Sequence, residues 1–218
     1  MPTNPFRPLS TGATELALGG TLDYRTYWLT RSAADALHDE VRALADFRVE
    51  QTFNYGRWVD QPRRTAWFGR WYLASSKYSR YTEAPAPGPC LAALAERVAS
   101  EWQFVTNAVL VNRYGPGDSV AYHADHEKLL APAPIVSILL AAERTFRIRP
   151  AGKDTAARLA SGGEHLTARL QHGDVVVMSH SMQQHYLHEV PAFKSDVGER
   201  LNLTFRQYTG GQHVPAPW

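Results

Sequence analysis

The sequence of 218 residues has few of the features that mark secreted or membrane proteins. Its one cysteine, Cys90, excludes an internal disulfide framework and is compatible with a reducing compartment. No run of eighteen apolar residues is present, and the start of the chain lacks the pattern of a signal peptide. We therefore expect a soluble, cytoplasmic protein without a membrane partner. We also expect a monomer, although these features leave the oligomeric state open. With 44% hydrophobic residues, the chain can bury one good core.

The formal net charge of +2 is too small to indicate a nucleic-acid-binding protein by itself. Residues 48–83, however, hold seven basic and three acidic side chains, a local charge of +4. Residues 53–81 also contain nine of the 24 aromatic residues. This combination suits a surface that contacts phosphates and stacks on the bases of a single strand or a flipped-out nucleotide. The alternative is a β-hairpin with some aromatics buried and its arginines at the rim.

The segment Arg200–Arg206 has two faces of opposite character. Side chains of a β-strand alternate between its faces, so one face would carry two leucines and a phenylalanine. The other face would carry two arginines, an asparagine and a threonine. Arginine is always charged, and its planar fork binds a carboxylate through two hydrogen bonds. Such a strand either faces water or holds a small dicarboxylate.

His123 and Asp125 lie two residues apart at the end of a short predicted strand. On an extended backbone their side chains point the same way. A later imidazole, from His185 or His188, would complete a set of two histidines and one carboxylate. That set leaves metal positions open and is typical of non-haem Fe(II) oxygenases. The alternative is a surface histidine beside a solvated aspartate.

These motifs belong to a longer series of segments that match the sequence pattern of one known family. The segments are Pro62–Gly69, Asn112–Glu127, Pro134–Ser137, Gly173–Met178, His188–Pro191 and Arg200–Arg206. On them, over roughly residues 50–208, the chain resembles the AlkB family of Fe(II)- and 2-oxoglutarate-dependent dioxygenases, most closely the branch that dealkylates nucleobases. The resemblance implies an α+β fold, a double-stranded β-helix (jelly-roll) core with flanking helices and an N-terminal nucleotide-recognition lid.

The resemblance also assigns the cofactor residues. The iron ligands would be His123, Asp125 and His188, since His188 precedes the Glu-Val-Pro that follows the family's distal ligand. His185 would then lie near the iron without binding it. Five residues would surround 2-oxoglutarate, with the second asparagine in a supporting role: Asn112, Tyr114, Arg200, Asn202 and Arg206. The implied cofactors are Fe(II), 2-oxoglutarate as co-substrate, and O2.

Four residues are assigned to the substrate: Glu127, Tyr78, Tyr55 and Arg63. Glu127 would accept a hydrogen bond from the amino group of adenine or cytosine and favour a cationic, alkylated base; otherwise it is a solvated carboxylate. Tyr78 would stack on the flipped base, with core packing as the alternative. Tyr55 lies where duplex-repair members carry an aromatic wedge, but here the residue is tyrosine rather than phenylalanine. Arg63 belongs to the basic segment.

Along the chain, we expect a loose arm over residues 1–20 and a single dioxygenase domain over 21–218. Within the domain, residues 48–83 would form the lid and 104–208 the catalytic core. Ser32 with Asp35 predicts the start of a helix over 33–47, and a second helix is predicted over 91–102. Strands are predicted over 104–114, 119–123, 134–141, 145–149, 166–171, 173–179 and 200–208, with a loop over 151–164.

The expected function is oxidative demethylation or dealkylation of N-alkylated bases, of the 1-methyladenine and 3-methylcytosine type, in DNA or RNA. The reaction would release succinate, CO2 and formaldehyde and would serve DNA alkylation repair. One alternative is a dioxygenase of the same fold that acts on a protein side chain or small metabolite. The other is a non-catalytic nucleic-acid-binding module with a degenerate metal site. The sequence leaves open DNA against RNA and single against double strands.

Overall fold

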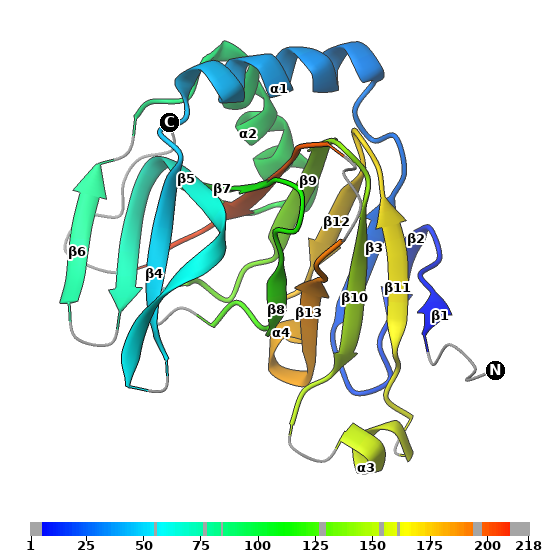
Figure 1. Cartoon of the computed structure of the whole chain (residues 1–218). Helices are drawn as coiled ribbons and strands as arrows, with labels where there is room; N and C mark the ends of the chain where they lie inside the picture. The colour runs from blue at the N-terminus through cyan, green and yellow to red at the C-terminus, as the bar shows by residue number, and fades with distance from the viewer. Residues whose placement is uncertain are drawn as a thin grey trace.

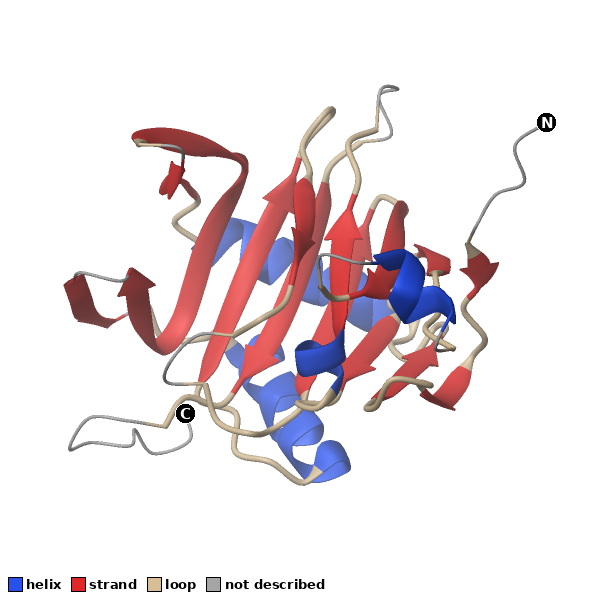
Figure 2. Ribbon diagram, turned by 90° about the horizontal axis from the view of Figure 1, so that it is seen from below, coloured by secondary structure: helices blue, strands red, loops and turns tan. Residues whose placement is uncertain are grey.

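The computed structural model describes residues 6–54, 56–75, 78–83, 85–126, 130–152, 155–160, 162–193 and 198–209. Two β-sheets pack face to face, and two long helices cover the outer side of the larger sheet (Figures 1 and 2). No helix among these residues has the length and apolar character needed to cross a membrane.

The smaller sheet has five strands among the described residues. Their order across the sheet is β1 (Arg7–Pro8), β11 (Leu166–Leu170), β10 (Arg144–Pro150), β13 (Tyr186–Val190) and β8 (Val120–His123). Strand β8 lies at the edge that faces the strands of residues 48–75 in Figure 1. This sheet is antiparallel except at β1, which pairs with β11 in parallel.

The larger sheet runs from the N-terminal strands to the strands of residues 48–75. Its order is β2 (Gly12–Glu15), β3 (Thr21–Arg25), β12 (Val175–Met178), β9 (Ile135–Ala141), β14 (Arg200–Arg206), β7 (Ala108–Tyr114), β5 (Arg57–Ser75) and β4 (Arg48–Asn54). Strand β6 (Tyr78–Glu83) pairs with the far end of β5. The helices are α1 (Arg31–Leu44), α2 (Pro89–Trp102), α3 (Thr155–Ala160) and α4 (Met182–His185).

Two apolar clusters hold these layers together. The first lies between the larger sheet and the two long helices, and it includes Leu37, Val41, Leu91, Leu94, Phe68, Val111, Leu203 and Phe205. The second lies between the sheets, and it includes Ile135, Leu139, Val176, Phe146, Ile148, Leu166 and Tyr186. A strand of the larger sheet therefore has helices on one face and the smaller sheet on the other.

Helix α1 begins earlier than predicted, because Thr30 rather than Ser32 caps it. The Thr30 hydroxyl accepts a hydrogen bond from the backbone N–H of Ala33. Helix α2 begins at Pro89, whose fixed φ suits a first helical position. The residue before it, Gly88, has no side chain to act as a cap.

The missing cap of α2 comes from α1. The Glu40 carboxylate accepts hydrogen bonds from the backbone N–H groups of Cys90 (2.9 Å) and Leu91 (2.8 Å). A Cβ atom at Gly88 would lie only 2.4 Å from Glu40 Cδ, so this close approach requires glycine. One carboxylate thus satisfies two free donors of α2 and joins the two helices.

The prediction of a loose arm over residues 1–20 is wrong for residues 6–20. Strand β1 pairs with β11 and β2 pairs with β3, and both Leu9 and Leu16 are buried. These two strands hold two and four residues. An alternation of apolar and polar residues cannot be recognised over so short a length, so these strands could not be predicted from the residue pattern.

Other elements were also not predicted. Strand β13 has alternating burial, but its central buried residue is the polar His188 and the apolar Leu187 beside it is only half-buried. This inverts the usual pattern of apolar residues inside and polar residues outside. Strand β3 was missed as well. Helix α3 occupies part of the segment predicted as a polar loop over 151–164.

The segment predicted as the lid, residues 48–83, contains β4, β5 and β6, and the central strand is β5. Its 19 residues pair first with β4, then with β7 and finally with β6. The β4–β5 hairpin extends beyond the neighbouring strands (Figure 1). Near its tip, Phe53 and Trp58 are about 60% exposed and meet edge to face, with ring centroids 5.4 Å apart. Such exposure is unusual for two large aromatic side chains in contact.

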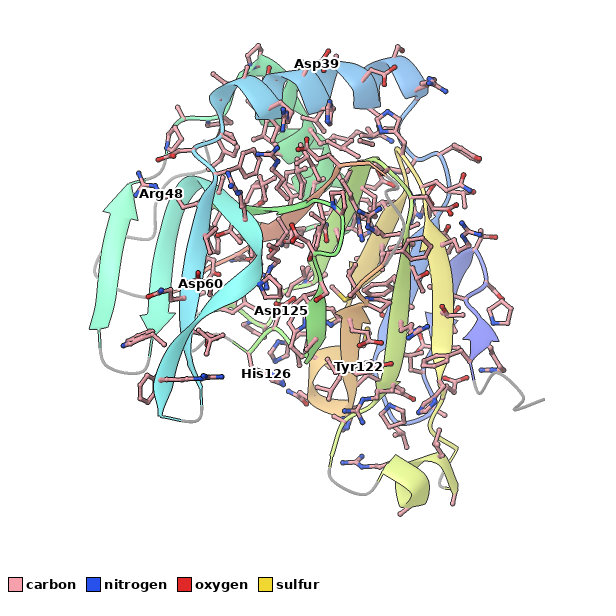
Figure 3. All side chains as sticks on the ribbon, viewed as in Figure 1. Asp39, Arg48, Asp60, Tyr122, Asp125 and His126 are labelled. Atoms are coloured by element: carbon pink, nitrogen blue, oxygen red, sulfur yellow. The ribbon has the colours of Figure 1, made fainter. Side chains whose placement is uncertain are left out.

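Replacing Glu40 tests the link between the helices. Glu40→Ala leaves two N–H groups at the start of α2 without a partner, so we expect the free energy of unfolding to fall by about 1–2 kcal/mol in urea titrations. Asp39→Ala is the matched control, because the Asp39 side chain is exposed on α1 (Figure 3). Equal stability of the two variants would contradict the capping role.

Candidate active site

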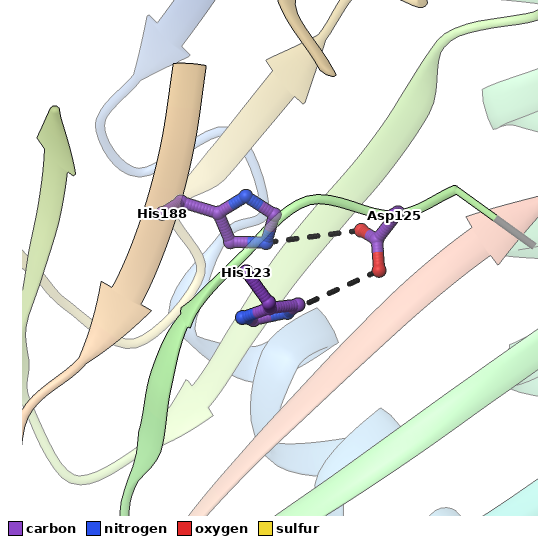
Figure 4. Close-up of side chains that lie close together, drawn as sticks. All are labelled: His123, Asp125 and His188. Carbon is purple, nitrogen blue, oxygen red and sulfur yellow. Dashed lines mark ion pairs between the residues drawn. The ribbon is translucent and has the colours of Figure 1, made fainter. Parts of the chain in front are cut away.

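The two sheets bring His123, Asp125 and His188 together. His123 ends β8, His188 is central in β13, and the two are directly paired across the strands. Their ring centroids are 4.2 Å apart. Asp125 follows β8, and its carboxylate lies 4.0 Å from His123 Nε2 and 3.7 Å from His188 Nε2 (Figure 4). One ligand atom from each residue lies within 4.8 Å of the other two. Two imidazoles and a carboxylate are a donor set for ferrous iron.

The ring nitrogens of His123 are oriented for metal binding. Its Nδ1 lies 2.8 Å from the carbonyl oxygen of Ala121, so Nδ1–H donates to the backbone and Nε2 keeps its lone pair. His188 is buried, and its Nδ1 has no hydrogen-bond partner among the described residues.

The charge states of the three residues also suit a metal. Burial, together with the neighbouring His123, lowers the pKa of His188 to about 3, although Asp125 opposes this shift. Burial raises the pKa of Asp125, but Arg206 and the two histidines outweigh it and hold that pKa below its ordinary value. At neutral pH the site therefore contains a neutral imidazole at His188 and a carboxylate at Asp125, the protonation states that bind metals.

A cavity of about 360 Å³ lies between the sheets at this site. Its lining includes the three candidate ligands together with Arg63, Asn112, Tyr114, Ser137, Phe146, Met178, Val190, Asn202, Thr204 and Arg206. Figure 3 shows Asp125 and His126 between β5 and β8. Because Arg63 of β5 is part of the lining, the cavity extends from β5 to the three candidate ligands.

Arg200 lies behind this cavity wall. Its guanidinium carbon is 5.4 Å from the ring centre of Tyr114, which lines the cavity. The side chain is buried, and Nε and Nη1 have no hydrogen-bond partner among the described residues. Burial lowers the pKa of Arg200 to about 10, so the group is still charged at neutral pH. A buried cation without an anion is costly, and the site therefore calls for a carboxylate ligand.

Strand β14 presents its polar face to the site. This arrangement agrees with the interpretation that the strand holds a small dicarboxylate. Arg206 Nη2 donates to Asp125 Oδ1 at 2.9 Å. Asn202 Nδ2 donates to Ser137 Oγ at 2.8 Å. On the adjacent strand β7, Asn112 Oδ1 accepts from Arg63 Nε at 2.7 Å. The water-facing interpretation is wrong, because all seven residues of β14 are buried.

The remaining predicted residues divide into two groups. His185 does not join the metal cluster; its ring packs against Gly19. Tyr55, Glu127 and the side chain of Tyr78 lie outside the described residues, and their substrate roles remain predictions. Ser137 was missed as a contact of Asn202, although a serine inside an apolar strand could have drawn attention to it.

Comparisons with known proteins agree with this geometry. The sequence model of the 2OG-Fe(II) oxygenase superfamily matches residues 21–206. The chain is 32% identical over 200 residues to the bovine protein named DNA oxidative demethylase ALKBH2, covering 88% of this chain and 70% of that one. Identity to the human protein of that name is 34% over 186 residues, with coverages of 81% and 69%. This chain belongs to the AlkB family of 2OG-Fe(II) oxygenases.

Two further similarities complete the comparison. Human alpha-ketoglutarate-dependent dioxygenase alkB homolog 3 is 34% identical over 150 residues, which cover 67% of this AlkB-family chain and 51% of the human protein. A solved structure titled "The structure of OsALKBH1" has a TM-score of 0.60 and 16% identity, and it covers 90% of this chain and all of that one. The latter shows a shared fold alone. The predicted jelly-roll core is confirmed.

Membership of the AlkB family implies Fe(II), 2-oxoglutarate and O2 as cofactors. The residues fit this requirement. The donor set of two imidazoles and a carboxylate can hold iron. The guanidinium of Arg200, whose Nε and Nη1 lack a hydrogen-bond partner among the described residues, can receive one carboxylate of the keto acid. The chain is therefore an Fe(II)- and 2-oxoglutarate-dependent dioxygenase.

The choice between His188 and His185 can be tested by metal binding. His188→Ala should weaken Mn(II) affinity by more than about 100-fold in calorimetric titrations, since losing residues that only support a ligand already costs about 10- to 100-fold. His185→Ala should leave the affinity unchanged. The reverse result would move the third ligand to His185.

Replacing Arg200 tests the co-substrate pocket. Arg200→Met should lower 2-oxoglutarate affinity of the Mn(II)-loaded protein by at least about 10-fold, because a hydrogen bond to a charged group contributes about 1.5–3 kcal/mol. Without ligand, its melting temperature should not fall, because the variant loses an unpaired buried cation.

Arg144→Met is the control for this experiment. Arg144 is buried on β10 and donates to the carbonyl oxygens of Gly115 and Gly198. Its loss should lower the melting temperature and leave 2-oxoglutarate affinity unchanged. Unaltered keto-acid affinity in Arg200→Met would refute its assignment.

Proposed function

We propose that this enzyme oxidatively removes methyl and other alkyl groups from N-alkylated bases in nucleic acids, of the 1-methyladenine and 3-methylcytosine type. One observation carries the proposal. A complete His-Asp-His set lines one cavity, and the buried Arg200, which has no anion partner among the described residues, lies behind the wall of that cavity. The chain that carries them is 32% and 34% identical to proteins named DNA oxidative demethylase.

The protein's own residues hold and orient the reactants. Iron would be bound by His123, Asp125 and His188, and 2-oxoglutarate would place one carboxylate against Arg200. When bound, iron and 2-oxoglutarate with O2 supply the oxidising chemistry, which yields succinate, CO2 and formaldehyde. Asn112 and Tyr114, on the strand beside β14, would complete the keto-acid contacts.

Apolar side chains form part of the wall around the reacting centre. Phe146, Met178 and Val190 line the cavity around the candidate ligands. In such surroundings, the charged groups Arg206 and Asp125 interact more strongly than they would in water. Their ion pair keeps the carboxylate in position for the metal.

The depth of the site supports a flipped or single-stranded substrate. The candidate ligands Asp125 and His188 are buried between the sheets, and a base stacked in a duplex cannot reach them. We propose that residues 48–83 form the substrate-recognition lid. Exposed Phe53 and Trp58 near the hairpin tip and Arg63 on the cavity wall support this assignment.

Three further residues belong to the proposal on the strength of the family motif alone. Glu127 would contact the base, Tyr78 would stack on it, and Tyr55 would fill the space that it leaves in a duplex. We further propose that one copy of the chain suffices for activity, because every candidate iron and keto-acid residue comes from one chain.

Mass spectrometry of modified oligonucleotides tests the proposed function. After incubation with Fe(II), 2-oxoglutarate and O2, DNA and RNA strands with one 1-methyladenine or 3-methylcytosine should be converted to the unmodified base. Formaldehyde and succinate should form in equal amounts, and His123→Ala should be inactive.

The outcome that would overturn the proposal is also defined. No base would change in any oligonucleotide, while a peptide or small metabolite stimulated succinate formation. Such a result would leave the dioxygenase assignment intact and move the substrate to another chemical class.

A further inference from the structure

Asp125 differs from the two histidines in how its backbone is held. His123 and His188 belong to β8 and β13 and are fixed by the pairing of those strands. Asp125 follows the end of β8 and has no strand partner. Its orientation therefore depends on other contacts, although its carboxylate must face both imidazoles to complete the site.

Two side chains provide such contacts. Arg206 Nη2 donates to the carboxylate oxygen Oδ1 at 2.9 Å. The backbone N–H of Asp125 donates to Gln183 Oε1 at 3.0 Å. The first contact holds the charged end of the side chain, and the second holds the main chain from which it projects.

Gln183 is well placed for this role. It is 1% exposed and lies in α4, five residues before the third candidate ligand, His188. Its amide group bridges two segments, because Nε2 also lies 3.6 Å from Met178 Sδ at the end of β12. A buried amide is costly unless it is hydrogen-bonded. Here both of its polar atoms have a partner.

We propose that Gln183 is a positioning residue of the metal site. Its carbonyl oxygen fixes the main chain at Asp125, so that the carboxylate faces His123 and His188. Because Gln183 and His188 belong to one short segment, this hydrogen bond fixes the position of Asp125 relative to His188. Without it, the N–H of Asp125 has no acceptor, and the carboxylate is held by Arg206 alone.

The proposal concerns metal binding and is independent of the nucleic-acid substrate. Its test is Co(II) affinity and the visible spectrum of the Co(II)-loaded protein. Gln183→Met keeps a side chain of similar length but removes the amide oxygen. We expect Co(II) affinity to fall by about 10- to 100-fold, the usual effect of removing a group that orients a ligand. The absorption bands should also change, since Asp125 no longer holds its place.

Two more variants separate positioning from packing. Gln184→Met is the matched control, because Gln184 is the exposed neighbour on the same short helix; its affinity and spectrum should match the parent protein. Gln183→Glu keeps an oxygen acceptor for the N–H of Asp125 and should restore most of the Co(II) affinity that Gln183→Met loses.

Either of two results would overturn the proposal. The first is a Gln183→Met variant that folds, as judged by circular dichroism, and binds Co(II) as tightly as Gln184→Met. The second is an equal loss of affinity in Gln183→Met and Gln183→Glu, which would assign the effect to core packing. If Gln183→Met does not fold, Gln183→Glu is compared with the parent protein instead. Its Co(II) affinity should stay close to the parental value, and a loss of 10-fold or more refutes the acceptor role.

Discussion

The burial of β14 on both faces is the constraint on which the site depends. The strand lies between β7 and β9, with α1 and α2 on one side and the cavity on the other. Its apolar residues pack under the helices, which leaves the charged residues no route to bulk water. Arg206 therefore pairs with Asp125, and Arg200 is buried beside Tyr114. Ordinary packing of the apolar face thus forces two guanidinium groups into the interior.

This arrangement gives the cavity an excess of positive charge. Arg63 and Arg206 line it and Arg200 lies behind its wall, whereas Asp125 is the ionised carboxylate among the described lining residues. A dicarboxylate and a divalent cation bring opposite charges to the same place. Before these ligands bind, the three arginines attract the dicarboxylate. The carboxylate of Asp125, beside its two histidines, attracts the metal ion.

Much of this organisation could be predicted from the sequence, for identifiable reasons. The two-faced pattern of Arg200–Arg206 is long enough to reveal a strand. His123 and Asp125 lie close together as predicted, because only one residue separates them in the sequence, although Asp125 lies beyond the end of β8 and is held by Gln183 and Arg206. By contrast, the pairing of His188 with His123 across two strands depends on register, which the sequence alone does not contain.

The failures have equally specific causes. Ser32 lies at an acceptable capping position, but the chain turns two residues earlier and Thr30 makes the hydrogen bond. The cap of α2 comes from Glu40, about fifty residues away, and no local motif announces such a contact. The role of Gln183 could not be predicted, because one of two adjacent glutamines in a polar segment looks like a solvated residue, and only the tertiary structure brings it to Asp125.

The short strand β1 has a consequence for the behaviour of the protein in solution. The N–H groups of Arg7 and Leu9 both point inward, to the carbonyl oxygens of His165 and Thr167 on the β11 side. The residue between them, whose amide would face outward, is Pro8 and has no N–H to donate. A strand from another molecule that approached this edge would meet a charged side chain. It would also lack the backbone N–H donor that a residue other than proline would offer at position 8. The β1 edge of the smaller sheet is thereby protected against edge-to-edge aggregation.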